Sequence, residues 1–302
     1  MKYAEKIAAT LDLKPQQIGR TIELMDAGNT LPFIARYRKE MTGELDEEQL
    51  RQISDQLSKL RSLDERRETI LAAIAEQGQL TPELKAKIDT ADTLTALEDL
   101  YQPYKKKRKT RADMARERGL QPLADLIIKQ ERSRESLAQL AQPFLSEEVP
   151  DVDSAWAGAR DIVAEMISDH AEIRGEVREK ALKWGMVQVS KVKDAEDAKE
   201  TYKLYYEFEQ RVDRVRPHQV LAINRGEAEK ILRVNVEVPQ RDWLRAIASR
   251  FLPHRNSSFF EQLDLAIQDA AARLLLPAIG RDVRRELTET AELHAIQVFA
   301  DN

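Results

Sequence analysis

The stretch of sequence that decides the fold reads Pro32-Phe-Ile-Ala-Arg-Tyr-Arg-Lys-Glu-Met-Thr-Gly-Glu-Leu45, and Asp46-Glu47 follow it directly. Its apolar residues suit a helix and alternate with cations: Phe33, Ile34 and Tyr37 with Arg36, Arg38 and Lys39. Gly43 then ends the helical pattern, because glycine favours helix termini. We interpret this stretch as a positioned surface rather than a generic helix.

The residues before this stretch predict a unit of short helices between positions 4 and 40. The first helix ends near Leu11, the second begins at Pro15 and closes at Gly28, and the third starts after Thr30. Short turns join the three helices. Such a unit is either a helix-turn-helix or a small helical bundle, since both are built from short helices with short connections.

A long helix is predicted directly after the stretch. Asp46 and Gln49 have the spacing of a capping box. Apolar residues then recur at spacings of three and four: Leu50, Ile53, Leu57 and Leu60. Continued to Glu76, the helix would be about 45 Å long. Asp64 and Arg67 interrupt the apolar stripe, so we expect a kink or a change of packing partner there.

Composition extends the helical prediction to the whole chain. The 302 residues suffice for about two domains, and 33% charged with only 6% aromatic residues favours amphipathic helices. Alternation predicts one strand, Ile231 to Val238, and its partner is predicted at Met186 to Val192. The predicted fold class is mainly α and multi-helical, with helix-turn-helix-like units, long helices and at most a small two-stranded β element.

Four segments are predicted along the chain. Residues 1–45 form the helix-turn-helix-like unit, and residues 46–118 contain the long helix, short helices and a basic segment. Residues 119–256 form a helical region with the small β element. Residues 257–302 form a C-terminal helix, disturbed at Leu276-Pro277 because proline lacks a backbone donor.

Motifs for catalysis, metals and cofactors are absent from the sequence. The ten glycines are never closer than nine residues apart, so neither a G-x-G cradle nor a P-loop exists. The histidines lack the spacing of helical metal ligands: His170, His218, His254 and His294. We predict no enzymatic activity, no cofactor and no metal site. The chain has no cysteine and no apolar run near the ~18 residues of a membrane span, so we predict a cytoplasmic protein without a membrane partner.

A basic segment stands out in a chain whose net charge is −5. Residues 104–118 carry eight cations and two acidic residues. The predicted nucleic-acid-binding residues combine this segment with the opening stretch: Lys105, Lys106, Lys107, Arg108, Lys109, Arg111, Arg36, Arg38 and Lys39. Tyr101 and Tyr104 offer rings for base stacking. The alternative is that these cations pair within the protein, those at 105–111 with the acidic body and those at 36–39 with Glu40 and Glu44.

Three motifs resemble the Tex family of bacterial transcription accessory proteins. They are the opening stretch with its FIARYRKE-TG-LDE-like signature, Leu97-Glu-Asp-Leu-Tyr-Gln-Pro-Tyr-Lys105 leading into residues 108–112, and Pro217-His-Gln-Val-Leu-Ala-Ile-Asn-Arg-Gly-Glu227. Leu274-Leu-Leu-Pro277 adds a fourth match. The matches are spread over essentially the whole chain.

The resemblance implies a cytoplasmic factor that binds RNA or DNA in transcription. Family members join a helical N-terminal region to a resolvase-like domain, helix-hairpin-helix elements and an OB-fold, and this sequence resembles only the first region. We therefore expect weak RNA or DNA binding and contacts with proteins of the transcription machinery. The alternative is a scaffold that positions downstream nucleic-acid-binding domains and docks that machinery.

Overall fold

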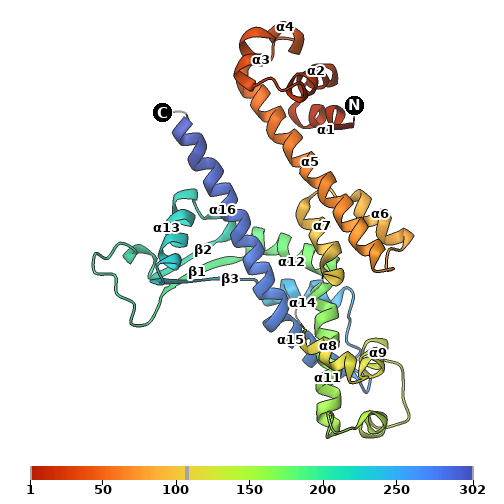
Figure 1. Ribbon diagram of the computed structural model, residues 1–302. Coiled ribbons are helices and arrows are strands. Elements are labelled where there is room, and N and C mark those ends of the chain that lie inside the picture. Colours follow the sequence, from red (N-terminus) through yellow and green to blue (C-terminus); the bar gives the residue numbers. More distant parts are fainter. Residues whose placement is uncertain (1, 106–108, 301–302) are drawn as a thin grey trace. The chain divides into compact units, whose positions relative to one another are not determined.

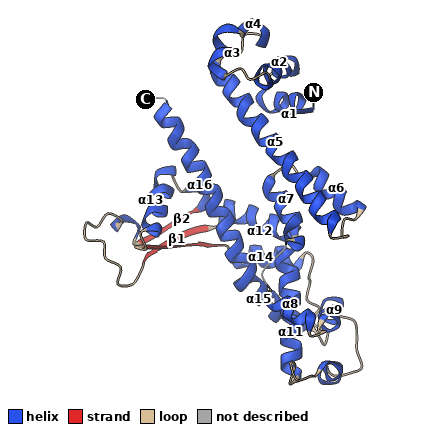
Figure 2. Cartoon of the chain, viewed as in Figure 1, coloured by secondary structure: helices blue, strands red, loops and turns tan. Residues whose placement is uncertain are grey.

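The computed structural model describes residues 2–105 and 109–300. The described chain is mainly helical with one small sheet, as predicted (Figures 1 and 2). Its contacts divide it into two compact units, Met1–Tyr101 and Gln102–Asn302. The boundary between them falls within the predicted segment 46–118, and the four-segment division stays a prediction.

The first unit consists of helices only within its described residues. They are α1 (Lys2–Leu11), α2 (Pro15–Asp26), α3 (Leu31–Tyr37), α4 (Lys39–Thr42), α5 (Glu47–Glu76), α6 (Pro82–Thr90) and α7 (Leu94–Tyr101). The predicted short helices correspond to α1, α2 and α3, and α4 adds one turn before Gly43. Buried Ile7, Ile18 and Ile34 pack with Leu50 and Ile53 of α5. The first half of α5 is therefore the support on which the short helices rest.

The packing partner of α5 changes near Asp64 and Arg67, as predicted, while the helix continues to Glu76. Before this point α5 contacts α1, α2 and α3, and it also contacts α6 and α7. Asp64 accepts hydrogen bonds from Tyr3 Oη at 2.9 Å and Lys2 Nζ at 3.1 Å. The Arg67 guanidinium donates to the carbonyls of Ile88 and Ala91. These two polar residues therefore tie α5 to α1 and to the end of α6.

The predicted capping box at the start of α5 is confirmed. Gln49 N–H donates to Asp46 Oδ1 at 2.7 Å, and Asp46 N–H donates to Gln49 Oε1 at 3.0 Å. Replacing Asp46 by alanine removes the acceptor for one of these bonds, so we expect a loss of about 0.5–2 kcal/mol in helix stability. Amide hydrogen exchange over residues 46–53, measured by mass spectrometry, should accelerate. Unchanged exchange in the variant would contradict this role.

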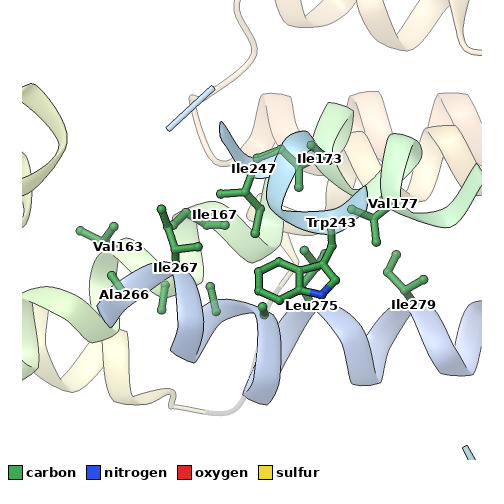
Figure 3. Packing of buried hydrophobic residues seen from close by; sticks show 14 of the residues in the cluster. Val163, Ile167, Ile173, Val177, Trp243, Ile247, Ala266, Ile267, Leu275 and Ile279 are labelled. Atoms are coloured by element: carbon green, nitrogen blue, oxygen red, sulfur yellow. The ribbon is translucent and has the colours of Figure 1, made fainter. Parts of the chain in front are cut away.

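The second unit is built around a central helix, α11. Its elements are η1 (Gln102–Tyr104), α8 (Arg111–Glu117), α9 (Gln121–Lys129), α10 (Leu137–Ala141), η2 (Gln142–Phe144), α11 (Val152–Asp169), α12 (Ala171–Trp184), β1 (Met186–Lys191), η3 (Lys203–Tyr205), β2 (Glu207–Arg211), η4 (Val212–Arg214), α13 (Pro217–Ala228), β3 (Leu232–Glu237), α14 (Gln240–Ala248), α15 (Phe260–Asp269), η5 (Ala270–Leu275) and α16 (Leu276–Ala300). Helices α8, α9 and α15 contact α11. Figure 3 shows Val163 and Ile167 of α11 near Ile267 of α15, and Trp243 of α14 beside Leu275 and Ile279.

The sheet has the antiparallel order β2-β1-β3. The predicted pairing of the strands near 186–192 and 231–238 is confirmed, with Val187 opposite Val236. The prediction of at most two strands is wrong, because β2 pairs with the other side of β1. Three of the five β2 residues are charged, so this outer strand lacks the apolar alternation of a half-buried strand.

The predicted disturbance at Leu276-Pro277 is confirmed. A π-helical segment, η5, separates α15 from α16 and ends directly before Leu276. Proline lacks a backbone N–H and its ring crowds the preceding turn, which favours an irregular ladder there. The path of the chain nevertheless stays helical from Phe260 to Ala300.

Candidate nucleic-acid interface

Helix α3 presents aromatic rings and cations together on its outer side. Ile34 is fully buried against α5, whereas Phe33 and Tyr37 are 37% and 65% exposed. Their rings lie one helical turn apart with centroids separated by 5.2 Å. We call Phe33, Arg36, Tyr37, Arg38 and Lys39 the α3 surface. Burial of Ile34 fixes the helix so that the other side chains face outward.

One cation of the α3 surface is held in place by its neighbours. The Arg38 guanidinium carbon lies 5.3 Å from the Phe33 ring centroid, and Nη1 donates to the Tyr37 carbonyl at 3.1 Å. Stacking on the ring and the hydrogen bond restrict the rotamers of this long side chain. Binding a ligand here then costs less side-chain entropy.

Acidic residues do little to neutralise the α3 surface. Lys39 Nζ lies 3.8 Å from Glu44 Oε2, and both side chains are more than half exposed. Such solvated pairs contribute about 0–1 kcal/mol. Arg36 is exposed, and it has no acidic partner among the residues that the structure describes. The surface therefore combines available positive charge with open ring faces, which suits phosphate binding and base stacking.

The basic segment lies in the second unit, where its described members sit near carboxylates. Lys106, Lys107 and Arg108 lie outside the described residues. Lys109 Nζ is 2.5 Å from Glu117 Oε2, in an exposed pair. Lys105 lines a cleft of about 450 Å³ together with Asp113, Glu165 and Asp169. The cations at 105 and 109 thus face acidic groups of their own unit.

Arg111 begins α8 and acts on a second acidic group. Burial raises the pKa of Asp161, and the positive charges of Arg273 and Arg111 oppose that rise. A hydrogen bond from Arg273 lowers the pKa of Asp269, and the charge of Arg111 acts in the same direction. Arg111 is exposed, yet part of its field is balanced by these two carboxylates.

The cleft beside Lys105 has mixed charge. Arg116 Nη1 lies 2.7 Å from Glu165 Oε2 and 3.1 Å from Asp113 Oδ1. His170 also lines the cleft. Within residues 2–105 and 109–300, no group of three or more histidine, aspartate or glutamate side chains is placed to hold a metal ion. No helix of this described part is long and apolar enough to span a membrane.

Sequence reasoning missed a second set of aromatic–cation pairs. The Arg211 guanidinium carbon lies 4.8 Å from the Trp184 ring centroid, and Lys191 Nζ lies 4.7 Å from that of Tyr206. Pairing of β1 with β2 brings these partners together from distant positions in the chain. No local motif signals such pairs, because each depends on the strand register.

Two family models match this helical architecture. One, described as Tex-like protein N-terminal domain, matches residues 1–75. The other, described as Tex central region-like, matches residues 133–299, which is more than half of the chain. These matches define the class as a region of a transcription accessory protein of the Tex type. The chain belongs to the Tex family, as the sequence motifs predicted.

Relatives from distant organisms agree with this assignment. An uncharacterized protein, YdcI, of Bacillus subtilis is 42% identical over 99% of this chain and 42% of its own length. The transcriptional accessory protein Tex of Neisseria gonorrhoeae is 36% identical over 100% of this chain and 40% of its own length. The human S1 RNA-binding domain-containing protein 1 is 28% identical over 96% of this chain and 30% of its own length. The chain thus spans about two fifths of the bacterial relatives.

Proposed function

We propose that this chain is a non-catalytic, cytoplasmic helical region of a transcription accessory factor, and that it binds RNA or DNA weakly through the α3 surface. Family membership supports the role in transcription, and two relatives are named for transcription and for RNA binding. The observation that carries the proposal is the α3 surface itself, in which Arg36 and Arg38 lie beside the exposed ring of Tyr37.

The expected affinity is low because the favourable charge is local. With a net charge of −5 the chain as a whole repels a polyanion, so attraction depends on the few cations that reach the phosphates. Stacking on Tyr37 adds roughly 1–3 kcal/mol per base, and this term is available only where bases are unpaired. We therefore expect single-stranded RNA or DNA to bind more tightly than duplex DNA.

Exchanging Arg36, Arg38 and Lys39 for glutamine tests this proposal. Three phosphate contacts to a single strand give a salt slope of about −2, so affinity should fall roughly 20-fold between 50 and 200 mM salt. The triple variant should lose most of its affinity at low salt, and its slope should approach zero. Fluorescence anisotropy with labelled oligouridine RNA and with duplex DNA measures both quantities.

A matched variant controls for the change in net charge. Lys59, Lys85 and Lys87 are exposed cations of the same unit outside the α3 surface, and exchanging all three for glutamine should leave RNA affinity nearly unchanged. Equal losses in both triple variants would show a general charge effect. Unchanged affinity in the α3 variant would contradict the assignment of the surface.

A second function, a protein scaffold for the transcription machinery, is favoured by the carboxylates near Lys105, Lys109 and Arg111. Because these acidic groups balance part of the basic segment, its cations also serve the internal electrostatics of the second unit. The scaffold proposal predicts stable capture of proteins from a nuclease-treated lysate. Recovery of nucleic acid without any protein would contradict it.

A further inference from the structure

The outer edge of β3 leaves backbone groups unused. β3 is an outer strand of the sheet, and Val192 N–H donates to the Ile231 carbonyl at 2.8 Å. Hydrogen-bonded pairs alternate along an antiparallel ladder, so the backbone groups of Asn235 face β1 and those of Val234 and Val236 point away from it. In the described chain no backbone or side-chain group bonds to these outward groups.

A groove follows this edge. Its volume is about 520 Å³, and Val234, Asn235 and Val236 line it along β3. Side chains of neighbouring strand residues point to opposite faces of a sheet, so a lining of consecutive residues places the groove along the edge. Pro277 and Gly280 of α16 form the opposite wall. The groove is thus bounded by a strand edge on one side and by an apolar helix face on the other.

One uncompensated cation marks the groove. Arg281 lines it and is exposed, and among the described residues it has no acidic partner. Arg284, one turn further on, is engaged by Glu227 at 2.5 Å. Glu237 accepts a hydrogen bond from Gln188 Nε2 at 2.6 Å. An entering segment therefore meets a net positive charge from Arg281.

We propose that the β3 edge binds an extended acidic peptide of a partner protein as a fourth strand. Its main chain would bond to the outward groups of Val234 and Val236, about 4.7–4.9 Å from β3. Alternate side chains would contact the apolar wall at Pro277, and a carboxylate would pair with Arg281. An open strand edge is a template for pairing, and the apolar wall and the cation select what pairs there.

This interaction specifies the scaffold role proposed above as a second function. It uses no residue of the α3 surface and requires no nucleic acid. Loss of peptide binding would therefore leave the RNA affinity of the α3 surface unchanged, and the two proposals fail separately.

A fluorescein-labelled peptide of about eight alternating valine and glutamate residues tests the proposal with the full chain, since an extended segment of that length spans all of β3. We expect saturable binding in fluorescence anisotropy. The same peptide with N-methyl groups on alternate residues should bind at least 10-fold more weakly, because it cannot form the strand ladder. This comparison leaves the protein unaltered, so folding does not affect it.

Two protein variants test the cation. Arg281→Glu should weaken binding at least 10-fold, whereas Arg255→Glu, an equal charge change at an exposed position that does not line the groove, should leave it unchanged. Equal binding of the methylated and unmethylated peptides, or equal affinity of the two variants, would overturn the proposal. Dimerisation of the chain that the peptide does not reverse, measured by analytical ultracentrifugation, would also overturn it.

Discussion

Replacing Asp282 by asparagine is expected to destabilise the second unit by about 3–5 kcal/mol. Asp282 of α16 accepts hydrogen bonds from Nη2 of both Arg174 and Arg178 of α12, each at 3.1 Å. The two arginine side chains are 8% and 9% exposed and the aspartate 15%. Asparagine keeps the shape but removes the negative charge, so two buried guanidinium groups lose their shared carboxylate.

Urea denaturation followed by tryptophan fluorescence measures this loss. All three tryptophans, Trp156, Trp184 and Trp243, belong to the second unit, so the signal reports on that unit alone. A loss of this size should move the midpoint by roughly 1 M or more. Arg285→Gln is the control, because Arg285 contacts the same Asp282 at 3.2 Å but is 60% exposed. It should cost less than about 1 kcal/mol. Equal midpoints for the two variants would contradict the buried role of Asp282.

Sequence reasoning succeeded where a structural signal is local. Asp46 and Gln49 are three residues apart, so a capping box could be predicted without knowing what packs on α5. Pro277 similarly predicts a disturbed helix from its own chemistry. The strand at 232–237 was found because its alternation reflects one buried face.

The missed features depend on contacts between distant residues. β2 is charge-rich and is a strand because β1 pairs with it, so its sequence alone lacks the signal. The stacking of Arg211 on Trp184 follows from that same pairing. For the candidate site, residue types were predictable but their surroundings were not. Lys109 lies beside Glu117 through the placement of α8, whereas Arg36 stays without an acidic partner among the described residues.

The distribution of cations between the units has a consequence for the salt dependence of binding. The α3 surface is in the first unit and the described basic segment is in the second. Cations whose charge is already balanced by carboxylates displace fewer counterions, so they add less to the salt slope than their number suggests. A slope near −2 would therefore point to the α3 surface alone, and a much steeper slope would require the segment 105–111 as well.

Replacing Phe259 by alanine is the second large expected effect, a loss of about 3–5 kcal/mol in the stability of the second unit. Phe259 precedes α15 and is fully buried. Its ring centroid lies 6.0 Å from that of Trp156 in α11, so the side chain fills the space where these two helices meet. Alanine would remove the buried ring surface and leave a cavity, because close-packed neighbours relax only partly.

The mechanism of this loss differs from that at Asp282, and the variants can separate the two. Phe259→Leu keeps part of the apolar volume, so it should lose less than half as much stability as Phe259→Ala, whereas no apolar residue restores the charge at position 282. Leu204, 85% exposed in the same unit, provides the control. Leu204→Ala should stay within about 0.5 kcal/mol of the original chain in urea denaturation. If Phe259→Ala and Leu204→Ala had the same midpoint, the contact between α11 and α15 would not be part of the cooperative core, and the second unit would owe its stability to other contacts.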